Sequence, residues 1–175
     1  MARIRISIGD ARHTIGNYKI MQPVFMARAI ELSVKNVQLG SGGPFGAVVV
    51  RNGQILAEGA NSVTATNDPT AHAEVLAIRT ACQKLGGFDL KGCELYTSCE
   101  PCPMCLGAIY WARLDRVYFG NLAVDAQKIG FDDSFIYREM EKPFSQRSIP
   151  MIQMMREEAL AAFRAWEEKA DKIPY

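Results

Sequence analysis

Hydrophobic residues recur with helical spacing in two parts of the chain, one near each end. The first has apolar side chains at intervals of four, four and three residues, at Met26, Ile30, Val34 and Val37. This spacing predicts a helix from Pro23 that buries that stripe and ends at Gly40. Helix-forming residues predict two more helices over residues 70–85 and 103–111, the second opened by a proline. A last helix carries its apolar stripe at Met155, Ala159, Phe163 and Trp166.

Short apolar runs predict strands between these helices. Residues 47–50 and 54–57 flank Asn52-Gly53, a dipeptide that accepts the positive φ angles of a tight turn, so they predict a β-hairpin. Further strands are predicted at residues 94–97 and 116–119. Strands that alternate with helices indicate a layered α/β domain with a largely, though not wholly, parallel sheet.

The composition narrows the class of protein. A chain of 175 residues supplies one full hydrophobic core and does not require two domains. A formal net charge of +1 disfavours a protein whose main task is to grip polyanions. The start of the chain lacks the apolar block of a signal peptide, and no apolar run is long enough to span a bilayer. Five cysteines, an odd number, indicate metal or redox chemistry in a reducing compartment, so we expect a cytoplasmic protein.

Candidate metal ligands lie at the starts of two predicted helices. The stretch SCEPCPMC, residues 98–105, places Cys102 just before a helix and Cys105 three residues later, so both sulfurs can point to one side. One of the two histidines, His72, begins the preceding helix, whereas His13 lies in the polar N-terminal arm and is expected at the surface. Helix starts can face each other at one end of an α/β sheet. One imidazole and two thiolates suit a catalytic zinc ion with an open fourth position.

A structural zinc site is the alternative to a catalytic one. Cys99 is close enough in sequence to supply a fourth thiolate, which would close the site and leave it without chemistry. Glu74, two residues after His72, favours the catalytic interpretation, because hydrolysis at zinc needs a group that accepts and returns protons. His-x-Glu followed by Pro-Cys-x-x-Cys is the pattern of zinc-dependent base deaminases.

Four blocks of sequence resemble the cytidine deaminase-like superfamily and, within it, the small bacterial guanine deaminases. They are GGPFGA at 42–47, NDPTAHAE at 67–74, TSCEPCPMCLGAIYWAR at 97–113 and FDDSFIY at 131–137. The likeness covers roughly residues 20–175. The first two blocks and the cysteines are shared with relatives that act on cytosine or on adenosine in tRNA, so the last block and the terminal tyrosine carry the substrate assignment.

The resemblance implies a fold, a cofactor and a reaction. The fold is a three-layer α/β/α sandwich around a mixed, mostly parallel five-stranded sheet. One zinc ion per subunit is held by His72, Cys102 and Cys105, and guanine is hydrolysed to xanthine and ammonia in purine catabolism. Related amino-azines such as ammeline are further candidate substrates. Glu74 is expected to carry the protons between water, ring and leaving amine.

Substrate contacts are implied at Phe45, Asn61, Ala73, Asp133 and Tyr175. Asp133 is expected to accept hydrogen bonds from guanine N–H groups in a pattern that adenine does not present. Its alternative is a solvated helix cap, just as Phe45 could be a core residue and Asn61 a loop residue. Glu139 is a candidate second proton carrier, with a plain surface role as the alternative.

The resemblance also implies a division of the chain and an assembly. Residues 1–19 form an N-terminal extension with a short predicted strand at 3–8, residues 20–150 a zinc-dependent deaminase domain, and residues 151–175 a C-terminal helix and tail. In similar guanine deaminases this last segment closes the active site of a neighbouring subunit in a swapped homodimer, with the terminal tyrosine in the pocket. We therefore expect a homodimer that takes a small nucleobase and binds neither nucleic acid nor membrane.

Two other functions are consistent with the zinc pattern. A tRNA adenosine deaminase shares it but must hold the phosphates of a flipped nucleotide. A basic C-terminal helix would favour that function, yet residues 151–175 carry four Lys or Arg against five Asp or Glu, a net charge of −1. A non-catalytic zinc protein is the third hypothesis, and the presence of Glu74 argues against it.

Overall fold

A four-stranded mixed sheet in the order β2-β1-β3-β4 forms the centre of the computed structural model, which describes residues 22–175. Strands β1 (Gly46–Arg51) and β2 (Gln54–Ala60) form the predicted hairpin, with φ of 52° at Asn52 and 75° at Gly53 in the turn. Strand β3 (Cys93–Cys99) lies antiparallel to β1 and parallel to β4 (Arg116–Asn121).

The sheet differs from the expected one in strand number and direction. It is mixed, as predicted, but within residues 22–175 it has four strands rather than five. Only the pairing of β3 with β4 is parallel, because β1 lies between β2 and β3 and runs antiparallel to both. The predicted strand at residues 3–8 and His13 fall outside the described residues.

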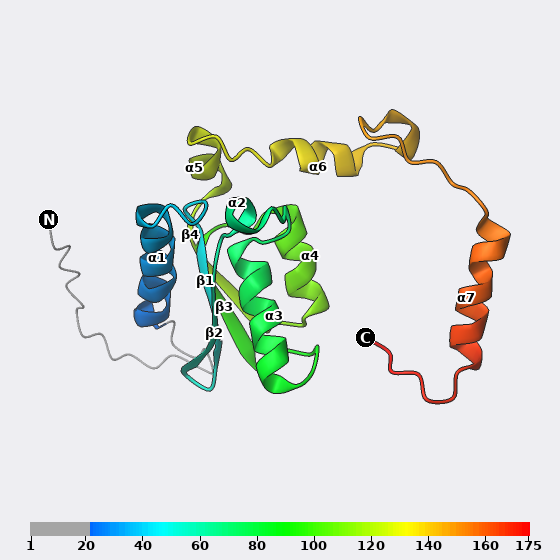
Figure 1. Cartoon of the computed structure of the whole chain (residues 1–175), viewed down its shortest axis with the longest axis horizontal. Helices are drawn as coiled ribbons and strands as arrows, with labels where there is room; N and C mark the ends of the chain where they lie inside the picture. Colours follow the sequence, from blue (N-terminus) through cyan, green and yellow to red (C-terminus); the bar gives the residue numbers. More distant parts are fainter. Residues whose placement is uncertain (1–21) are drawn as a thin grey trace, which may run out of the picture.

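Helices on both faces of the sheet complete three layers (Figure 1). Helix α1 (Pro23–Gln38) covers one face, and α3 (Ala73–Leu85) and α4 (Pro103–Trp111) cover the other. The bounds of α4 match the prediction. Helix α3 starts three residues later than expected and ends at Gly86, whose φ is 67°. The residues before α3 form a loop that brings His72 to its N-cap position.

The buried face of α1 is not the predicted stripe. Ile30, Val34 and Val37 are 44–54% exposed. The face that packs on the sheet is offset by one position and consists of Phe25, Ala29, Ser33 and Asn36. The reason is the close approach of α1 to β1: a Cβ added at Gly46 would lie 2.4 Å from the Ala29 carbonyl oxygen. Only small side chains fit beside Gly46, so Ala29 and Ser33 lie there and the larger aliphatic residues of the predicted stripe face outward.

The last third of the chain holds elements that the spacing of apolar residues did not predict. These are α5 (Ala123–Lys128), α6 (Ser134–Glu141) and a 3₁₀ turn (Phe144–Gln146), while a one-turn helix α2 (Val63–Thr66) precedes α3. The predicted last helix forms as α7 (Arg156–Glu168). It stands apart from the sandwich at the end of an extended connection (Figure 1), and its apolar stripe is exposed.

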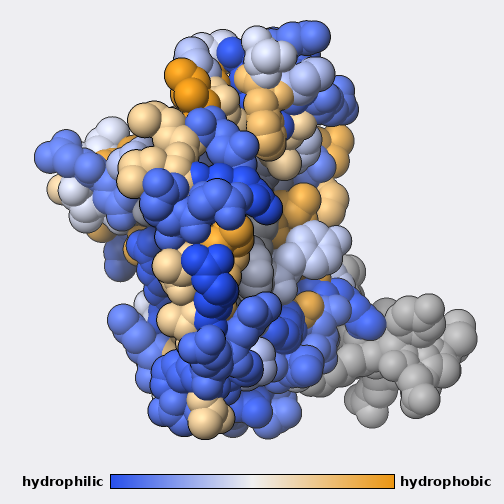
Figure 2. All heavy atoms as spheres, turned by 90° about the vertical axis from the view of Figure 1, so that its right-hand side faces the viewer, coloured by the Kyte–Doolittle hydropathy of each residue, from blue (hydrophilic) through white to orange (hydrophobic). Residues whose placement is uncertain are grey.

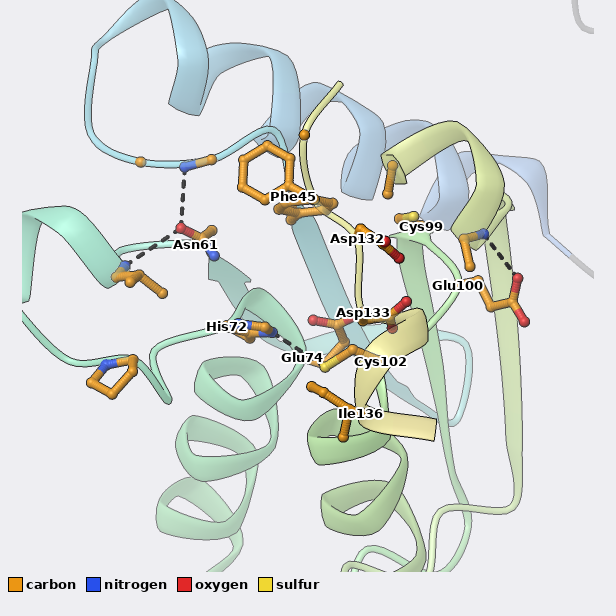
Figure 3. Close-up of a pocket in the computed structure, with 18 of the residues that line it drawn as sticks. Phe45, Asn61, His72, Glu74, Cys99, Glu100, Cys102, Asp132, Asp133 and Ile136 are labelled. Carbon is orange, nitrogen blue, oxygen red and sulfur yellow. Dashed lines mark hydrogen bonds between the residues drawn. The ribbon is translucent and has the colours of Figure 1, made fainter. Parts of the chain in front are cut away.

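The core lies on both sides of the sheet. Val49 and Leu95 pack against Ile78 of α3 on one side, and Val48 and Tyr96 pack against Phe25 of α1 on the other. Among the described residues, none of the helices combines the length and the apolarity needed to cross a membrane. At one end of the sheet, β1 and β3 lie next to the starts of α3 and α4. His72, Glu74 and Cys102 lie together there (Figure 3).

Candidate active site

The three predicted metal ligands converge at the starts of α3 and α4. His72 is the N-cap residue of α3, Cys102 is the N-cap residue of α4, and Cys105 lies in the first turn of α4. His72 Nδ1 lies 3.5 Å from the sulfur of Cys102 and 3.5 Å from that of Cys105. All three ligand atoms lie within 4.8 Å of one another. The sequence therefore predicted correctly which side chains come together.

The spacing of these atoms fits a tetrahedral zinc ion. With Zn–S and Zn–N bonds of ordinary length, a nitrogen and a sulfur at two corners of a tetrahedron lie about 3.6 Å apart. The hydrogen bond from Cys105 lowers the pKa of Cys102 below the ordinary value of a thiol, which favours the thiolate that zinc binds. Cys99 does not join the group: its thiol donates to the Leu122 carbonyl oxygen at 3.7 Å. Three protein ligands leave a fourth position for water, as a catalytic site requires.

Glu74 lies beside the ligands with its carboxylate buried. Its side chain is 5% exposed, and its Oε1 accepts a hydrogen bond from Thr97 Oγ1 at 3.1 Å. Its Oε2 lies 3.5 Å from the sulfur of Cys105. Burial raises the pKa of Glu74, which suits a group that must both accept and return a proton.

A cavity of about 630 Å³ opens above the ligands. His72, Glu74 and Cys102 line its floor, and Phe45 forms part of its wall (Figure 3). Phe131 lines the cavity beside Phe45. The two rings meet edge to face, with their centroids 5.0 Å apart and an interplanar angle of 88°. The predicted contact residue Phe45 is thus part of the wall, and the volume suits a small flat ligand.

Asn61 lines the cavity with a fixed amide orientation. Its Oδ1 accepts hydrogen bonds from the backbone N–H groups of Gly43 at 3.1 Å and Val63 at 3.4 Å. Because both partners are donors, the atom that they bind must be the oxygen. The amide nitrogen, Nδ2, has no acceptor among the described residues and is left to donate to a ligand.

Asp133 also lines the cavity and occupies the N-cap position of α6. Asp132 Oδ1 accepts from the N–H of Ser134 at 2.9 Å, whereas the Asp133 side chain makes no cap hydrogen bond. Burial raises the pKa of Asp133, helped by the nearby negative charges of Cys102, Asp132 and Glu100. The carboxylate of Asp133 is therefore available for N–H donors on a ligand.

Three of the residues named from the sequence do not line this cavity. Ala73 is completely buried at the start of α3. Tyr175 is 72% exposed, with its ring 6.0 Å from that of Trp111 and 6.2 Å from that of Phe88. Glu139 is paired with Lys142 and accepts from Ser148 N–H at 2.7 Å, and the Lys142 hydrogen bond lowers its pKa to about 2. Within one chain, Glu139 therefore holds no proton near neutral pH. The substrate contacts of Ala73 and Tyr175 and the proton-carrying role of Glu139 stay predictions.

Sequence reasoning missed two groups in the cavity. Phe131 was part of a recognised block but had no assigned contact, since only the fold brings it against Phe45. Glu100 lines the cavity and accepts from Ala123 N–H at 3.0 Å, which ties the end of β3 to the start of α5. With Glu74, Asp132 and Asp133 it makes four carboxyl groups in the lining, and no lysine or arginine of residues 22–175 lines it.

The fold and the three ligands define a class of zinc-dependent deaminase. The family described as "Cytidine and deoxycytidylate deaminase zinc-binding region" matches residues 21–121, so the chain belongs to that family. The chain is 56% identical to the guanine deaminase of Bacillus subtilis over 151 residues, which covers 86% of this chain and 97% of that protein.

Two further matches place this likeness in context. The crystal structure of guanine deaminase from Bacillus subtilis superimposes with a TM-score of 0.86 at 54% identity, covering 89% of this chain and 99% of that one. A tRNA-specific adenosine deaminase of Aquifex aeolicus is 48% identical over 79 residues, 45% of this chain and 52% of that protein. The likeness to the guanine deaminase thus extends beyond the zinc-binding region into the C-terminal third.

Proposed function

We propose that this chain is a zinc-dependent guanine deaminase, which hydrolyses guanine to xanthine and ammonia. The observation that carries the proposal is the position of Glu74, buried beside the zinc ligands at the floor of a cavity of about 630 Å³. Identity of 56% with a guanine deaminase over nearly its whole length supports the choice of substrate. The reaction belongs to purine catabolism, and ring analogues such as ammeline remain candidate substrates.

His72, Cys102 and Cys105 would hold the zinc ion, and Glu74 handles the protons. When bound, zinc acts as a Lewis acid that makes water nucleophilic near neutral pH. The Glu74 carboxylate would accept one proton from the attacking water and deliver it to a ring nitrogen. It would then accept the proton of the hydroxyl group added to the ring carbon and deliver it to the amine, which leaves as ammonia while the carbonyl group forms. Thr97 holds one carboxylate oxygen at 3.1 Å and so keeps the carboxylate in place between these transfers.

The cavity wall recognises the base by shape and by hydrogen bonds. The rings of Phe45 and Phe131 form an apolar part of the wall against which a flat heterocycle can pack. Asn61 offers an N–H donor to an acceptor of guanine, and Asp133 offers a carboxylate to its N–H groups. A base without those N–H groups would cover the Asp133 carboxylate without pairing it, which costs more than the loss of a contact.

The charge of the lining disfavours a nucleic-acid substrate. Four carboxyl groups face the cavity, and the described residues around it include no lysine or arginine. A flipped nucleotide would bring phosphates against this acidic lining. Guanine as a free base has no phosphate, so the same lining does not exclude it.

We further propose a homodimer in which residues 151–175 of one chain close the active site of the other. Ile30, Val34 and Val37 of α1 leave one apolar stripe exposed, and Met155, Phe163 and Trp166 of the α7 segment leave another. Seen from the side of α7, hydrophobic side chains interrupt a largely hydrophilic surface (Figure 2). Exchange of α7 between two chains would bury both stripes and bring Tyr175 to a neighbouring cavity. A cytoplasmic location agrees with the five free cysteines.

The test is ammonia release by the zinc-loaded protein. The substrates are guanine, ammeline, adenine, cytosine and a tRNA anticodon stem-loop, and Glu74→Gln is the control. We expect release from guanine, and a loss of about 100- to 10,000-fold in kcat with Glu74→Gln, as is typical when a general acid–base is removed. Zinc content should be unchanged in the variant, because Glu74 is not a ligand.

Each other outcome points to a different function. Release from the stem-loop alone would make the protein an RNA-editing deaminase. No release from any of these substrates, with one zinc ion bound per chain, would favour a structural zinc site or an untested ring. Equal activity of the wild type and Glu74→Gln on guanine would exclude the proton-carrying role.

A further inference from the structure

Asn36 of α1 is a buried polar residue that the proposed mechanism leaves unused. It lies on the face of α1 that packs against the sheet and is 6% exposed. A buried amide is costly unless its hydrogen bonds are made. The groups that hydrogen-bond to the Asn36 amide therefore indicate its role.

Both hydrogen bonds of the Asn36 amide go to loops that line the cavity. Its Nδ2 donates to the Gly43 carbonyl oxygen at 2.8 Å and to the Asn61 carbonyl oxygen at 2.8 Å. Since both partners are carbonyls, the donating atom must be the amide nitrogen. One side chain thus holds together the loop before β1 and the loop after β2, which lie 18 residues apart in sequence.

Further bonds between these loops complete the clamp around Asn61. The Asn61 N–H donates to the Phe45 carbonyl oxygen at 3.0 Å, and the Gly43 N–H donates to Asn61 Oδ1 at 3.1 Å. Gly42 lies so close that an added Cβ would be 2.2 Å from the Asn61 carbonyl oxygen. The backbone of Asn61 is therefore held from two sides, and its Oδ1 is engaged by the same loop that Asn36 holds.

We infer that Asn36 is a positioning residue that fixes the Asn61 amide with its N–H₂ group toward the base. The inference rests on the proposed function for the identity of the base. The hydrogen bonds that Asn36 makes are independent of that function. Without Asn36, two buried carbonyl oxygens lose their donor and the two loops lose their link. Asn61 then adopts other orientations, and the hydrogen bond to an acceptor of guanine is made in only a fraction of the molecules.

The first test compares Asn36→Ala with Ser33→Ala in the zinc-loaded full chain. Ser33 is a matched control because it is buried on the same face of α1, and its hydroxyl donates within its own helix, to the Ile30 carbonyl oxygen at 2.8 Å. We expect Asn36→Ala to raise KM for guanine about tenfold while kcat stays within about threefold. The reason is that the hydrogen bond from Asn61 to the base is equally strong in the bound substrate and in the transition state, and losing such a bond changes KM rather than kcat. Ser33→Ala should leave both constants within about twofold.

A double-mutant cycle shows whether Asn36 acts through Asn61. In the Asn61→Ala background, adding Asn36→Ala should change KM by less than about twofold, because the group that it positions is gone. A further tenfold rise in KM, or a fall in kcat at unchanged KM, would overturn the inference. Should Asn36→Ala not fold, Asn36→Asp keeps the size of the side chain and opposes both carbonyls with a carboxylate, and the same comparisons apply.

A readout without turnover separates this inference from the proposed function. The side-chain amide resonances of Asn61 are assigned in a ¹⁵N–¹H spectrum by their loss in Asn61→Ala. We expect them to shift by more than a linewidth in Asn36→Ala and to stay in place in Ser33→Ala. Unmoved resonances in Asn36→Ala would overturn the positioning role. If Asn36→Ala shifts these resonances but the wild-type chain does not deaminate guanine, the positioning role is supported and only the proposed function is overturned.

Discussion

At the scale of single residues, the site depends on close approaches as much as on reactive groups. His72, Cys102 and Cys105 need the first turns of α3 and α4 to bring their ligand atoms within 4.8 Å. Asn61 needs Gly42 beside it, because no side chain fits between that residue and the Asn61 carbonyl oxygen. A small residue that takes no part in the chemistry is therefore as necessary as a polar one.

Gly42→Ala tests this close approach. The added Cβ would lie 2.2 Å from the Asn61 carbonyl oxygen, so the loops must move apart. We expect the free energy of unfolding to fall by about 1–3 kcal/mol, as for other overpacked sites, and KM for guanine to rise. Gly87→Ala is the control, since a Cβ there meets nothing within 4 Å. Urea denaturation measures both variants, and equal stabilities would contradict the prediction.

At the scale of elements, an ion pair between Arg28 and Glu58 joins α1 to the sheet in addition to the buried face of the helix. Arg28 of α1 binds the Glu58 carboxylate of β2 with two hydrogen bonds, of 2.7 Å and 2.8 Å. The hydrogen bond from Arg28 lowers the pKa of Glu58 below its ordinary value of 4.5. Because α1 also carries Asn36, this ion pair helps to hold the element that organises the loops of the cavity.

Glu58→Gln gives a pH-dependent loss of stability. A carboxyl group whose pKa is lowered by folding stabilises the folded state above its unfolded pKa and loses that effect as pH falls through its folded pKa. We expect Glu58→Gln to reduce the free energy of unfolding by about 1 kcal/mol at pH 7. The difference from wild type should shrink steadily as the pH is lowered from 4.5.

The control for that variant uses the same guanidinium group. Glu31 contacts Arg28 at 2.8 Å from a more exposed position, with a side chain that is 64% exposed against 35% for Glu58. Glu31→Gln should cost less than about 0.5 kcal/mol at pH 7. Denaturation curves between pH 3 and pH 7 measure both. A loss for Glu58→Gln that does not change with pH would show that the charge of Glu58 is not its cause.

At the scale of the whole molecule, helix α7 does not pack on the three-layer sandwich. Helix α7 has no buried residue, and Figure 1 shows it away from the three layers. Phe163 is 70% exposed and Met155 66% exposed, although both belong to the predicted apolar stripe. Isolated helices of this length are marginal in water, so α7 needs a surface to pack on, and a second chain would offer one.

Deletion of residues 150–175 tests the exchange of this segment. We expect the full chain to sediment as a dimer and the truncated chain to lose both guanine deamination and most of its dimer, because the deletion removes α7 and Tyr175. Sedimentation equilibrium gives the mass, and ammonia release gives the activity. A truncated chain that stays dimeric and active would exclude the exchange.

The sequence by itself determined the chemistry that is local along the chain. The zinc ligands and Glu74 follow from intervals of two and three residues at helix starts, and the hairpin follows from Asn52-Gly53. Such features depend on backbone geometry within one turn or one helical repeat, and that geometry is the same in every fold.

Only the tertiary structure decided the contacts between segments that are far apart in the sequence. The buried face of α1 could not be predicted, because two stripes one position apart share the same spacing and only the approach to Gly46 selects the smaller one. Phe131 meets Phe45, and Asn36 meets Asn61, across 86 and 25 residues of chain. The arrangement that places a base over the zinc site is set by these long-range contacts, since no local pattern encodes which loops will pack together.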